Sequence, residues 1–169
     1  MNQLLLLDAQ NYPPDLPEIC RVAVRGIILL HGKLLLIEND FGEVKLPGGG
    51  MEAGETEADT LTREVREETG YTVIPDSIHP FGQIEEKRLS VHEPMIWHQI
   101  SRLYFCQVEP DAGECAYTAN EQRHAFHRAL YTVDEAIRIN RAMLDREGES
   151  PWNQREYRTL LLLKQHLEC

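Results

Sequence analysis

The chain has 169 residues, 42% of them hydrophobic, and this length suits one domain with a proper core better than two. Its formal net charge of −11 leaves no basic footprint, so nucleic-acid polymers and anionic membrane surfaces are excluded as expected partners. An anionic small molecule would need bound cations to reverse the local field.

The cysteines and the N-terminal residues favour a cytoplasmic protein. The 4 cysteines form neither a Cys-x-x-Cys pair nor a zinc spacing, so reduced thiols in a cytosol are the simplest account. The apolar run from Leu4 to Leu7 stops at Asp8 without a preceding basic segment, and we expect neither a signal peptide nor a membrane span there. Within an N-terminal arm of residues 1–19, these leucines form either an edge strand or a contact of a homodimer.

Strands that lead into a glycine-rich loop are predicted next. We expect a β-hairpin over residues 21–37 with its turn at His31-Gly32, and a short strand at residues 43–46. Arg25 interrupts the apolar pattern of the hairpin. It either reaches a phosphate or is an ordinary exposed or ion-paired arginine, and we favour the second interpretation. The loop Gly48-Gly49-Gly50 would let a metal or a phosphate approach the main chain closely.

A capped helix is predicted to follow the glycine loop. Thr56 is the expected N-cap, Asp59 is its capping-box partner, and Gly70 is the residue that ends the helix. An apolar stripe at helical spacing would bury one side of this helix against the protein. The stripe consists of Ala58, Leu61 and Val65.

The same helix carries a face of three carboxylates. At about 100° per residue, Glu64, Glu67 and Glu68 fall within an arc of roughly 100°. Like charges at these spacings repel one another unless a cation neutralises them. Oxygen ligands of this kind suit Mg²⁺ or Mn²⁺. The alternative is a solvated acidic face, which is the usual outcome for a Glu-rich helix.

The second half of the chain is predicted to add further strands. They are expected at residues 71–74, 78–86, 96–108 and 129–131. Both alternating sets of the long strand at 96–108 are apolar, so it should lie at the centre of the sheet, covered on both faces. A loop over residues 110–120 should follow it and lead to Glu121.

Two more helices are predicted near the C-terminus. Thr132 should cap the first, with Glu135 as its capping-box partner and Gly148 ending that region. The last helix should start with Ser150 as the N-cap and Pro151 at the first helical position, and run to about Leu167.

The spacing around the acidic helix resembles the signature of the Nudix hydrolase family. Gly49 is followed after five residues by Glu55, and after seven more by Arg63-Glu64-Val65-Arg66-Glu67-Glu68-Thr69-Gly70. The one departure is Tyr71, where the family usually has an aliphatic residue. That change affects a packing contact and not the chemistry. A match fixed at so many positions is specific.

This resemblance implies a fold and an activity. The fold is α/β, a Nudix-type α/β/α sandwich with a mixed, largely antiparallel sheet, in a single domain over residues 20–169. The implied activity is that of a MutT-like pyrophosphohydrolase, which uses Mg²⁺ or Mn²⁺ and the attack of water on a phosphorus atom. Bound cations offset phosphate charge and lower the pKa of bound water.

The resemblance also assigns roles within the motif. Glu64, Glu67 and Glu68 are the implied metal ligands, and Glu64 is also the candidate that orients or deprotonates the water. Arg63 and Glu55 match the family pair whose ion pair braces the loop against the helix.

Residues outside the motif give further candidates. Glu121 is a candidate metal ligand or general base, with a solvated loop glutamate as the alternative. The candidates for substrate binding are Arg25, Lys45, Gly48 and Gly49, and the carbonyl of Gly48 or Gly49 is also a candidate further oxygen for a metal. Two interpretations are equally open for four basic side chains, which either hold a terminal phosphate or form a salt bridge with the acidic surface. They are Lys45, Lys87, Arg88 and Arg102. An ordinary surface or hydrogen-bonded role is favoured over zinc binding for the histidines His92, His98, His124 and His127. A place in the core is favoured over stacking on a base for Trp97 and Tyr104.

The expected substrate is a nucleoside diphosphate linked to a second moiety, or a nucleoside triphosphate, cleaved at a phosphoanhydride with release of a nucleoside monophosphate. Residues 85–89 contain neither the proline nor the tyrosine that often marks enzymes for ADP-ribose or dinucleoside polyphosphates, and the coenzyme A signature is also missing. Two other classes stay open. One is a catalytically silent nucleotide-binding or sensor module, and the other is a scaffold or dimerisation domain.

Overall fold

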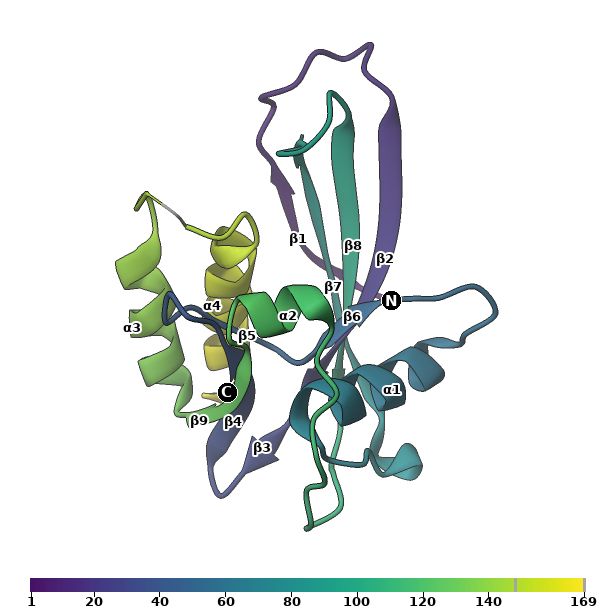
Figure 1. The fold of residues 1–169 in the computed structure, drawn as a ribbon, viewed down its shortest axis with the longest axis vertical. Coiled ribbons are helices and arrows are strands. Elements are labelled where there is room, and N and C mark those ends of the chain that lie inside the picture. Colours follow the sequence, from purple (N-terminus) through teal and green to yellow (C-terminus); the bar gives the residue numbers. More distant parts are fainter. Residues whose placement is uncertain (148, 169) are drawn as a thin grey trace.

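The structure, a computed structural model, describes residues 1–147 and 149–168. Its larger sheet has five strands in the order β1-β7-β8-β2-β6 (Figure 1). These strands are β1 (Gln3–Asp8), β2 (Glu18–Ile27), β6 (Gly48–Gly50), β7 (His79–Leu89) and β8 (Ile96–Phe105). The pairs β1–β7 and β2–β8 are parallel, whereas β7–β8 and β2–β6 are antiparallel.

A second, smaller sheet is antiparallel throughout, with β4 pairing to β3, β5 and β9. Its strands are β3 (Leu29–Leu30), β4 (Lys33–Glu38), β5 (Val44–Lys45) and β9 (His127–Tyr131). The helices are α1 (Glu57–Thr69), α2 (Ala119–Arg123), α3 (Val133–Met143) and α4 (Asn153–Leu167), with a 3₁₀ turn η1 (Pro75–Ser77). The predicted α/β class and the mixed, largely antiparallel pairing are confirmed, although the strands divide into two sheets.

Two hydrophobic cores lie on opposite sides of the strands. The first joins α1 to the strands through Leu61 and Val65, which pack with Val24. The second joins α3 and α4 to the strands and includes Leu160 and Leu163. Because side chains alternate along a strand, β4 contributes Leu35 to the first core, and Leu34 and Leu36 to the second. The parts of the strands that carry these two cores therefore lie between α1 on one side and α3 and α4 on the other, as the predicted sandwich requires.

The predicted helix caps are confirmed for α1 and α3. Thr56 and Asp59 form a capping box at the start of α1, and Gly70 ends the helix with a φ of 74°. Thr132 and Glu135 form the same arrangement at the start of α3. One detail of α1 was wrong: Ala58 is exposed, because the buried side of the helix runs through other residues. The buried residues of α1 are Thr60, Leu61, Val65, Glu68 and Thr69.

The start of α4 corrects a prediction. Ser150 does not cap this helix, since its hydroxyl donates a hydrogen bond to the buried Glu43. The helix begins at Asn153 with Trp152 at the N-cap position, so Pro151 lies before the first turn. The prediction for Gly148 lies outside the described residues.

Strand boundaries also differ from prediction. The predicted strand at residues 71–74 is absent apart from an isolated bridge between Val73 and Val108, because the main chain there makes just two hydrogen bonds with the short segment after β8, Ile74 N–H to the Gln107 carbonyl and Glu109 N–H to the Thr72 carbonyl. The turn at His31-Gly32 is as predicted, but the first strand of the hairpin is split at Ile28, so that β2 and β3 belong to different sheets.

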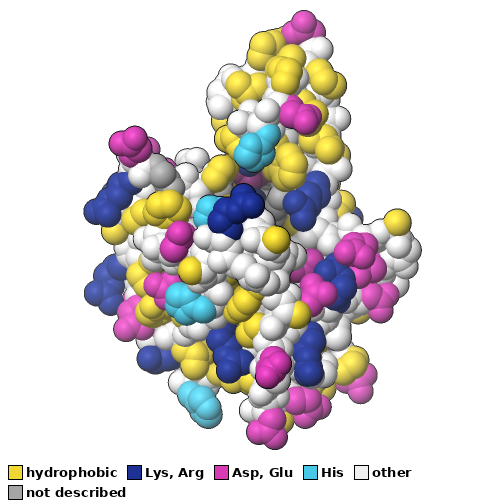
Figure 2. All heavy atoms as spheres, in the orientation of Figure 1, with side chains coloured by type: hydrophobic (Ala, Val, Ile, Leu, Met, Phe, Trp, Pro, Cys, Tyr) yellow, Lys and Arg dark blue, Asp and Glu magenta, His cyan; other side chains and the backbone are white. Residues whose placement is uncertain are grey.

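The sheet projects beyond the rest of the molecule at one end, where β1, β7, β8 and the start of β2 run side by side (Figure 1). β1 is its outer strand, paired with β7. Hydrophobic side chains gather over this end (Figure 2), and the exposed ones include Leu6, Ile19 and Val91. A homodimer through this arm stays a prediction.

Among the described residues, no helix is long and apolar enough to cross a bilayer. Cys20, Cys106 and Cys115 carry free thiols, and burial raises the pKa of the Cys106 thiol to about 12. Cys169 lies outside the described residues.

Candidate active site

Glu68 joins α1 to the glycine strand β6. Its side chain is 2% exposed; Oε2 accepts a hydrogen bond from the Gly48 N–H at 2.7 Å, and Oε1 lies 2.7 Å from Lys45 Nζ. Burial raises the pKa of Glu68, and the positive charges of Lys45 and Arg25 oppose this shift. Gly48 has a φ of 136°, and a Cβ there would collide with the Val24 carbonyl. The hydrogen bond from the Gly48 N–H to Glu68 therefore requires glycine at this position.

Arg25 lies behind the same strand. It is 8% exposed, and its Nη1 donates to the carbonyls of Leu46 and Gly48. Its buried Nε has no hydrogen-bond partner among the described residues. The favoured interpretation of Arg25 as an exposed or ion-paired arginine is therefore wrong: β2 places it inside the protein, where backbone carbonyls replace a carboxylate as its partners. Its role in substrate binding stays a prediction.

Arg63 connects the loop before α1, the glycine strand and the acidic face. Its Nε lies 2.6 Å from Glu55 Oε1 and its Nη2 donates to Glu55 Oε2 at 2.9 Å, which gives a two-point ion pair. The same Nη2 donates to the Gly50 carbonyl at 3.2 Å. The guanidinium holds the pKa of Glu55 down at about 2. The ion pair that braces the loop against the helix is thus present.

The acidic face is divided between two cations. Arg63 Nη1 lies 2.8 Å from Glu64 Oε1 and 3.3 Å from Glu67 Oε2, so these two carboxylates converge on one nitrogen. Glu68 points instead toward Lys45 and the glycine strand. Among the described residues, no group of three His, Cys, Asp or Glu side chains is arranged to hold a metal ion. The structure therefore brings Glu64 and Glu67 together and sets Glu68 apart.

These residues fit a hard divalent cation by their donor chemistry. The carboxylates of Glu64 and Glu67 offer oxygen ligands alone, and the Glu67 side chain is 40% exposed, which leaves access from solvent. The Glu64 carboxylate lies directly against Gly49, where a Cβ would collide with it. Gly49 thus lets the Glu64 carboxylate lie against the main chain of the glycine strand.

Glu121 lies in α2 and not in the loop where it was predicted. Its Oε2 accepts hydrogen bonds from the N–H and the hydroxyl of Thr118, both at 2.8 Å, which completes the capping box of this short helix. The contacts of Glu121 are those of a helix cap, and its part in catalysis stays a prediction.

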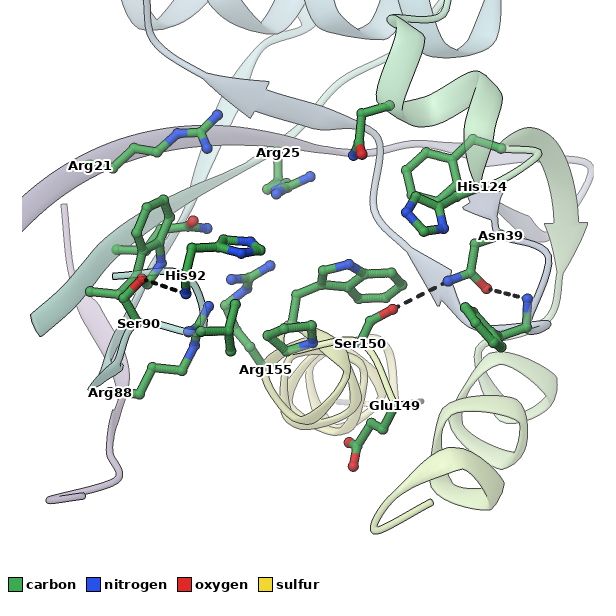
Figure 3. A pocket seen from close by; sticks show the side chains of 18 residues that line it. Arg21, Arg25, Asn39, Arg88, Ser90, His92, His124, Glu149, Ser150 and Arg155 are labelled. Atoms are coloured by element: carbon green, nitrogen blue, oxygen red, sulfur yellow. Dashed lines mark hydrogen bonds between the residues drawn. The ribbon is translucent and has the colours of Figure 1, made fainter. Parts of the chain in front are cut away.

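A pocket of about 560 Å³ lies beside this site, between the projecting part of the sheet, the start of α4 and the start of α2 (Figure 3). Such a volume suits a nucleotide-sized ligand. The pocket borders the glycine strand through Arg25, whose guanidinium bonds to Gly48. Its charged and aromatic lining includes Arg21, Arg25, Arg88, Arg155, Phe41, Trp97, Phe126 and Trp152.

Sequence reasoning missed several lining residues. Arg21 and Arg25 share one face of β2 by alternation, and this signal would have found Arg21. Arg155 comes from α4, far away in the sequence, and no local pattern indicated it.

The salt-bridge interpretation holds for most remaining basic candidates. Lys87 pairs with Glu18 at 3.0 Å and Arg88 with Glu86 at 3.3 Å, while Arg102 pairs with Glu57. The hydroxyl of Tyr104 also bonds to Glu57. The other predicted candidates have these neighbours: His98 lies between Glu18 and Glu85, His124 lies near Asp40, His127 lies near Glu38, and His92 lines the pocket.

Comparisons with known proteins agree with this geometry. A protein named putative ADP-ribose pyrophosphatase YjhB, from Bacillus subtilis, is 29% identical over 112 residues, which cover 66% of this chain and 50% of that protein. An ADP-ribose pyrophosphatase from Methanocaldococcus jannaschii is 51% identical over 53 residues, covering 29% of this chain and 31% of that protein. The chain thus spans half or less of the length of these relatives.

A solved structure gives the same fold. The crystal structure of a MutT NUDIX hydrolase from Burkholderia pseudomallei superposes with a TM-score of 0.54 at 19% identity, over 69% of this chain and 85% of that one. The family description "NUDIX domain" matches residues 21–152 of the chain, which include the glycine strand, α1 and most of the pocket. The chain therefore belongs to the Nudix family.

Proposed function

We propose that the protein is a pyrophosphohydrolase that cleaves a phosphoanhydride in a nucleoside diphosphate linked to another moiety, or in a nucleoside triphosphate. The observation that carries the proposal is the convergence of Glu64 and Glu67 on Arg63 next to the glycine strand, which Arg25 connects to a pocket of nucleotide size. The names of the relatives support a nucleotide-type substrate and make ADP-ribose the first compound to test.

A divalent cation, Mg²⁺ or Mn²⁺, would be held by Glu64 and Glu67, with Glu68 as a third ligand. When bound, it would supply charge neutralisation at the phosphates and a lower pKa for a bound water. The metal role of Glu68 would require its carboxylate to leave Lys45, with which it now forms a buried ion pair. Lys45 would then be available to a phosphate oxygen, which fits its predicted role in substrate binding.

The protein side chains have distinct parts in this proposal. Arg63 holds Glu64 in place and, through Glu55 and Gly50, fixes the loop and the glycine strand relative to α1. Glu64 is the candidate that orients the attacking water or accepts its proton. Gly48 and Gly49 let the diphosphate approach the main chain, and Arg25 holds that strand through the Gly48 carbonyl.

A second candidate function is a nucleotide sensor on the same fold that binds without turnover. The separation of Glu68 from the other two carboxylates, by its buried ion pair with Lys45, specifically favours this alternative. Such a protein would bind the nucleotide in the arginine-lined pocket and release it unchanged.

A panel of diphosphate compounds separates the two functions. Purified protein would be incubated with ADP-ribose, sugar nucleotides, dinucleoside polyphosphates and nucleoside triphosphates, with Mg²⁺ or Mn²⁺ and with a chelator, and the products would be identified by chromatography. We expect metal-dependent release of a nucleoside monophosphate from at least one compound. Saturable binding of a compound with no product from any of them would establish the sensor instead. Turnover of non-nucleotide diphosphates alone would contradict the nucleotide part of the proposal.

A further inference from the structure

The pocket is basic, although the chain as a whole carries a net charge of −11. Of its lining residues that the structure describes, four are arginines and one, Glu149, has a carboxylate. The Glu149 carboxylate accepts hydrogen bonds from the Asp145 N–H and from the side-chain amide of Asn153, so both of its oxygens already have partners near the start of α4. Figure 3 shows Arg21 and Arg25 on β2, with Arg155 facing them from α4.

The carboxylates beneath the pocket do not balance these arginines. Arg155 Nη1 lies 2.7 Å from Glu86 and its Nη2 lies 3.2 Å from Glu156. Glu86 is also the partner of Arg88, at 3.3 Å from its Nε, so that one carboxylate serves two guanidinium groups. Buried Arg25 has carbonyl partners and an unpaired Nε. An excess of positive charge therefore remains at the pocket.

Arg21 contributes to this excess from an exposed position at the pocket rim. It has no carboxylate within ion-pair distance among the described residues, and its guanidinium carbon lies 6.0 Å from the centre of the Trp97 ring, while that of Arg88 lies 5.8 Å from it. A Cβ at Gly50 would collide with the Arg21 guanidinium, which places Arg21 directly against the glycine strand. Arg21 thus stands between the proposed diphosphate site and Trp97.

We infer that this pocket selects substrates with a second anionic group outside the diphosphate, a phosphate or a carboxylate, which Arg21 binds beside Trp97, while Arg88, on the strand on the other side of Trp97, adds positive charge. The inference rests on the proposed function and names its substrate class. The Arg21 guanidinium alone offers several N–H donors to one anion. Trp97 on β8 lies between the strands that carry Arg21 and Arg88, so the two positive charges flank its ring. An uncharged moiety would leave Arg21 without a partner, so selectivity should follow charge.

Two matched pairs of compounds test the inference. ADP-ribose would be compared with ADP-ribose 2′-phosphate, and UDP-glucose with UDP-glucuronate, by kcat and KM with Mg²⁺. We expect kcat/KM to be higher for the charged member of at least one pair by about tenfold, the worth of one charge-assisted hydrogen bond. Preference within the first pair identifies a phosphate, and preference within the second identifies a carboxylate. A ratio near one in both pairs overturns the inference.

Variants assign the preference to the arginines. In Arg21→Gln the preference should be lost, and in Arg88→Gln it should be reduced, because KM rises more for the charged compound than for the uncharged one. Arg21→Lys should retain part of the preference. The matched control is Arg138→Gln, an exposed arginine on α3, which should keep the full preference. A preference that persists in both glutamine variants, with thermal stability like that of the wild type, would contradict the inference.

The outcome stays separable from that of the proposed function. If none of the four compounds is hydrolysed, the proposed function is not supported for these compounds, and they are then compared as ligands that bind without turnover. Their dissociation constants, measured by calorimetry, then replace kcat/KM in the same comparison. The charged member should bind more tightly by about tenfold, and Arg21→Gln should abolish the difference. Equal affinities, or no binding at all, would contradict the inference.

Discussion

Lys45 and Arg63 divide the carboxylates of α1 between them, and the two groups differ in burial. The Glu67 side chain is 40% exposed, whereas the Glu68 and Lys45 side chains are 2% and 10% exposed. Removing the charge at Glu67 leaves Arg63 paired with Glu55 and Glu64, but removing it at Glu68 leaves the buried Lys45 without a carboxylate partner. The glutamates of the sequence motif therefore contribute differently to the stability of the fold.

Glu67→Gln should lower turnover by orders of magnitude at unchanged thermal stability, because it removes a proposed metal ligand whose side chain is 40% exposed and leaves Arg63 paired with Glu55 and Glu64. Glu68→Gln should lower turnover too, and also reduce the free energy of unfolding by about 3 kcal/mol. Steady-state kinetics and urea unfolding measure the two effects, with the exposed Glu109→Gln as the control. Full activity in the double variant Glu67→Gln/Glu68→Gln would rule out the metal site.

The ion pair of Glu55 and Arg63 predicts a pH dependence of stability. The folded-state pKa of Glu55 is about 2, below its ordinary value of 4.5. Its stabilising effect is thus fully present above the ordinary value and is lost as the pH falls toward the folded value. Glu55→Gln should lower the melting temperature at neutral pH and flatten its decline in acid, whereas the neighbouring Glu52→Gln should do neither. Parallel melting curves for Glu55→Gln and the wild type across this range would contradict the assignment.

The elements with their own local signals were predictable from sequence. α1 and α3 begin at capping boxes, a pattern fixed by two residues three positions apart, and both starts were correct. Ser150 and Pro151 formed an equally good local signal for α4, but the buried Glu43, distant in sequence, takes the hydroxyl of Ser150. The pocket was not predictable, since Arg155 and Trp97 line the same pocket only because α4 packs against the strands.

Glu121 in α2 has two candidate roles, helix cap and general base, and a variant of its capping partner Thr118 separates them. If Glu121 only caps the helix, Glu121→Gln and Thr118→Ala should have similar, small effects on activity and no effect on its pH profile. If Glu121 is the general base, Glu121→Gln alone should lower kcat and remove the acidic limb of the profile. Identical pH profiles for the wild type and both variants would show that Glu121 caps the helix and is not the general base.

For the molecule as a whole, the N-terminal arm raises the question of where the domain begins. Residues 20–169 were predicted to form the domain, and this division stays a prediction. Leu4 and Leu5 of β1 pack against the second core, and a Cβ at Gly82 would collide with Leu4. The arm therefore contributes apolar contacts to the folded protein.

Deletion of residues 1–9 should lower the free energy of unfolding by about 2 kcal/mol or more, because Leu4 and Leu5 lose their burial. For a chain of this size the melting temperature should fall by roughly 4 °C or more. Leu4→Ala should reproduce part of the loss, whereas Leu6→Ser, at a position that is 51% exposed, should not. An unchanged melting temperature after the deletion would show that the arm is dispensable for stability.

The central claim is that the acidic face of α1 performs metal-dependent hydrolysis of a phosphoanhydride. The most direct test is a Mg²⁺ titration of product release from the best compound of the panel, in the wild type and in Glu64→Gln. We predict no product with chelator alone, a rate that rises and saturates with Mg²⁺ in the wild type, and a rate lower by orders of magnitude in Glu64→Gln at every Mg²⁺ concentration. Hydrolysis at the same rate with chelator and with Mg²⁺, or an unaltered titration in Glu64→Gln, would contradict the claim.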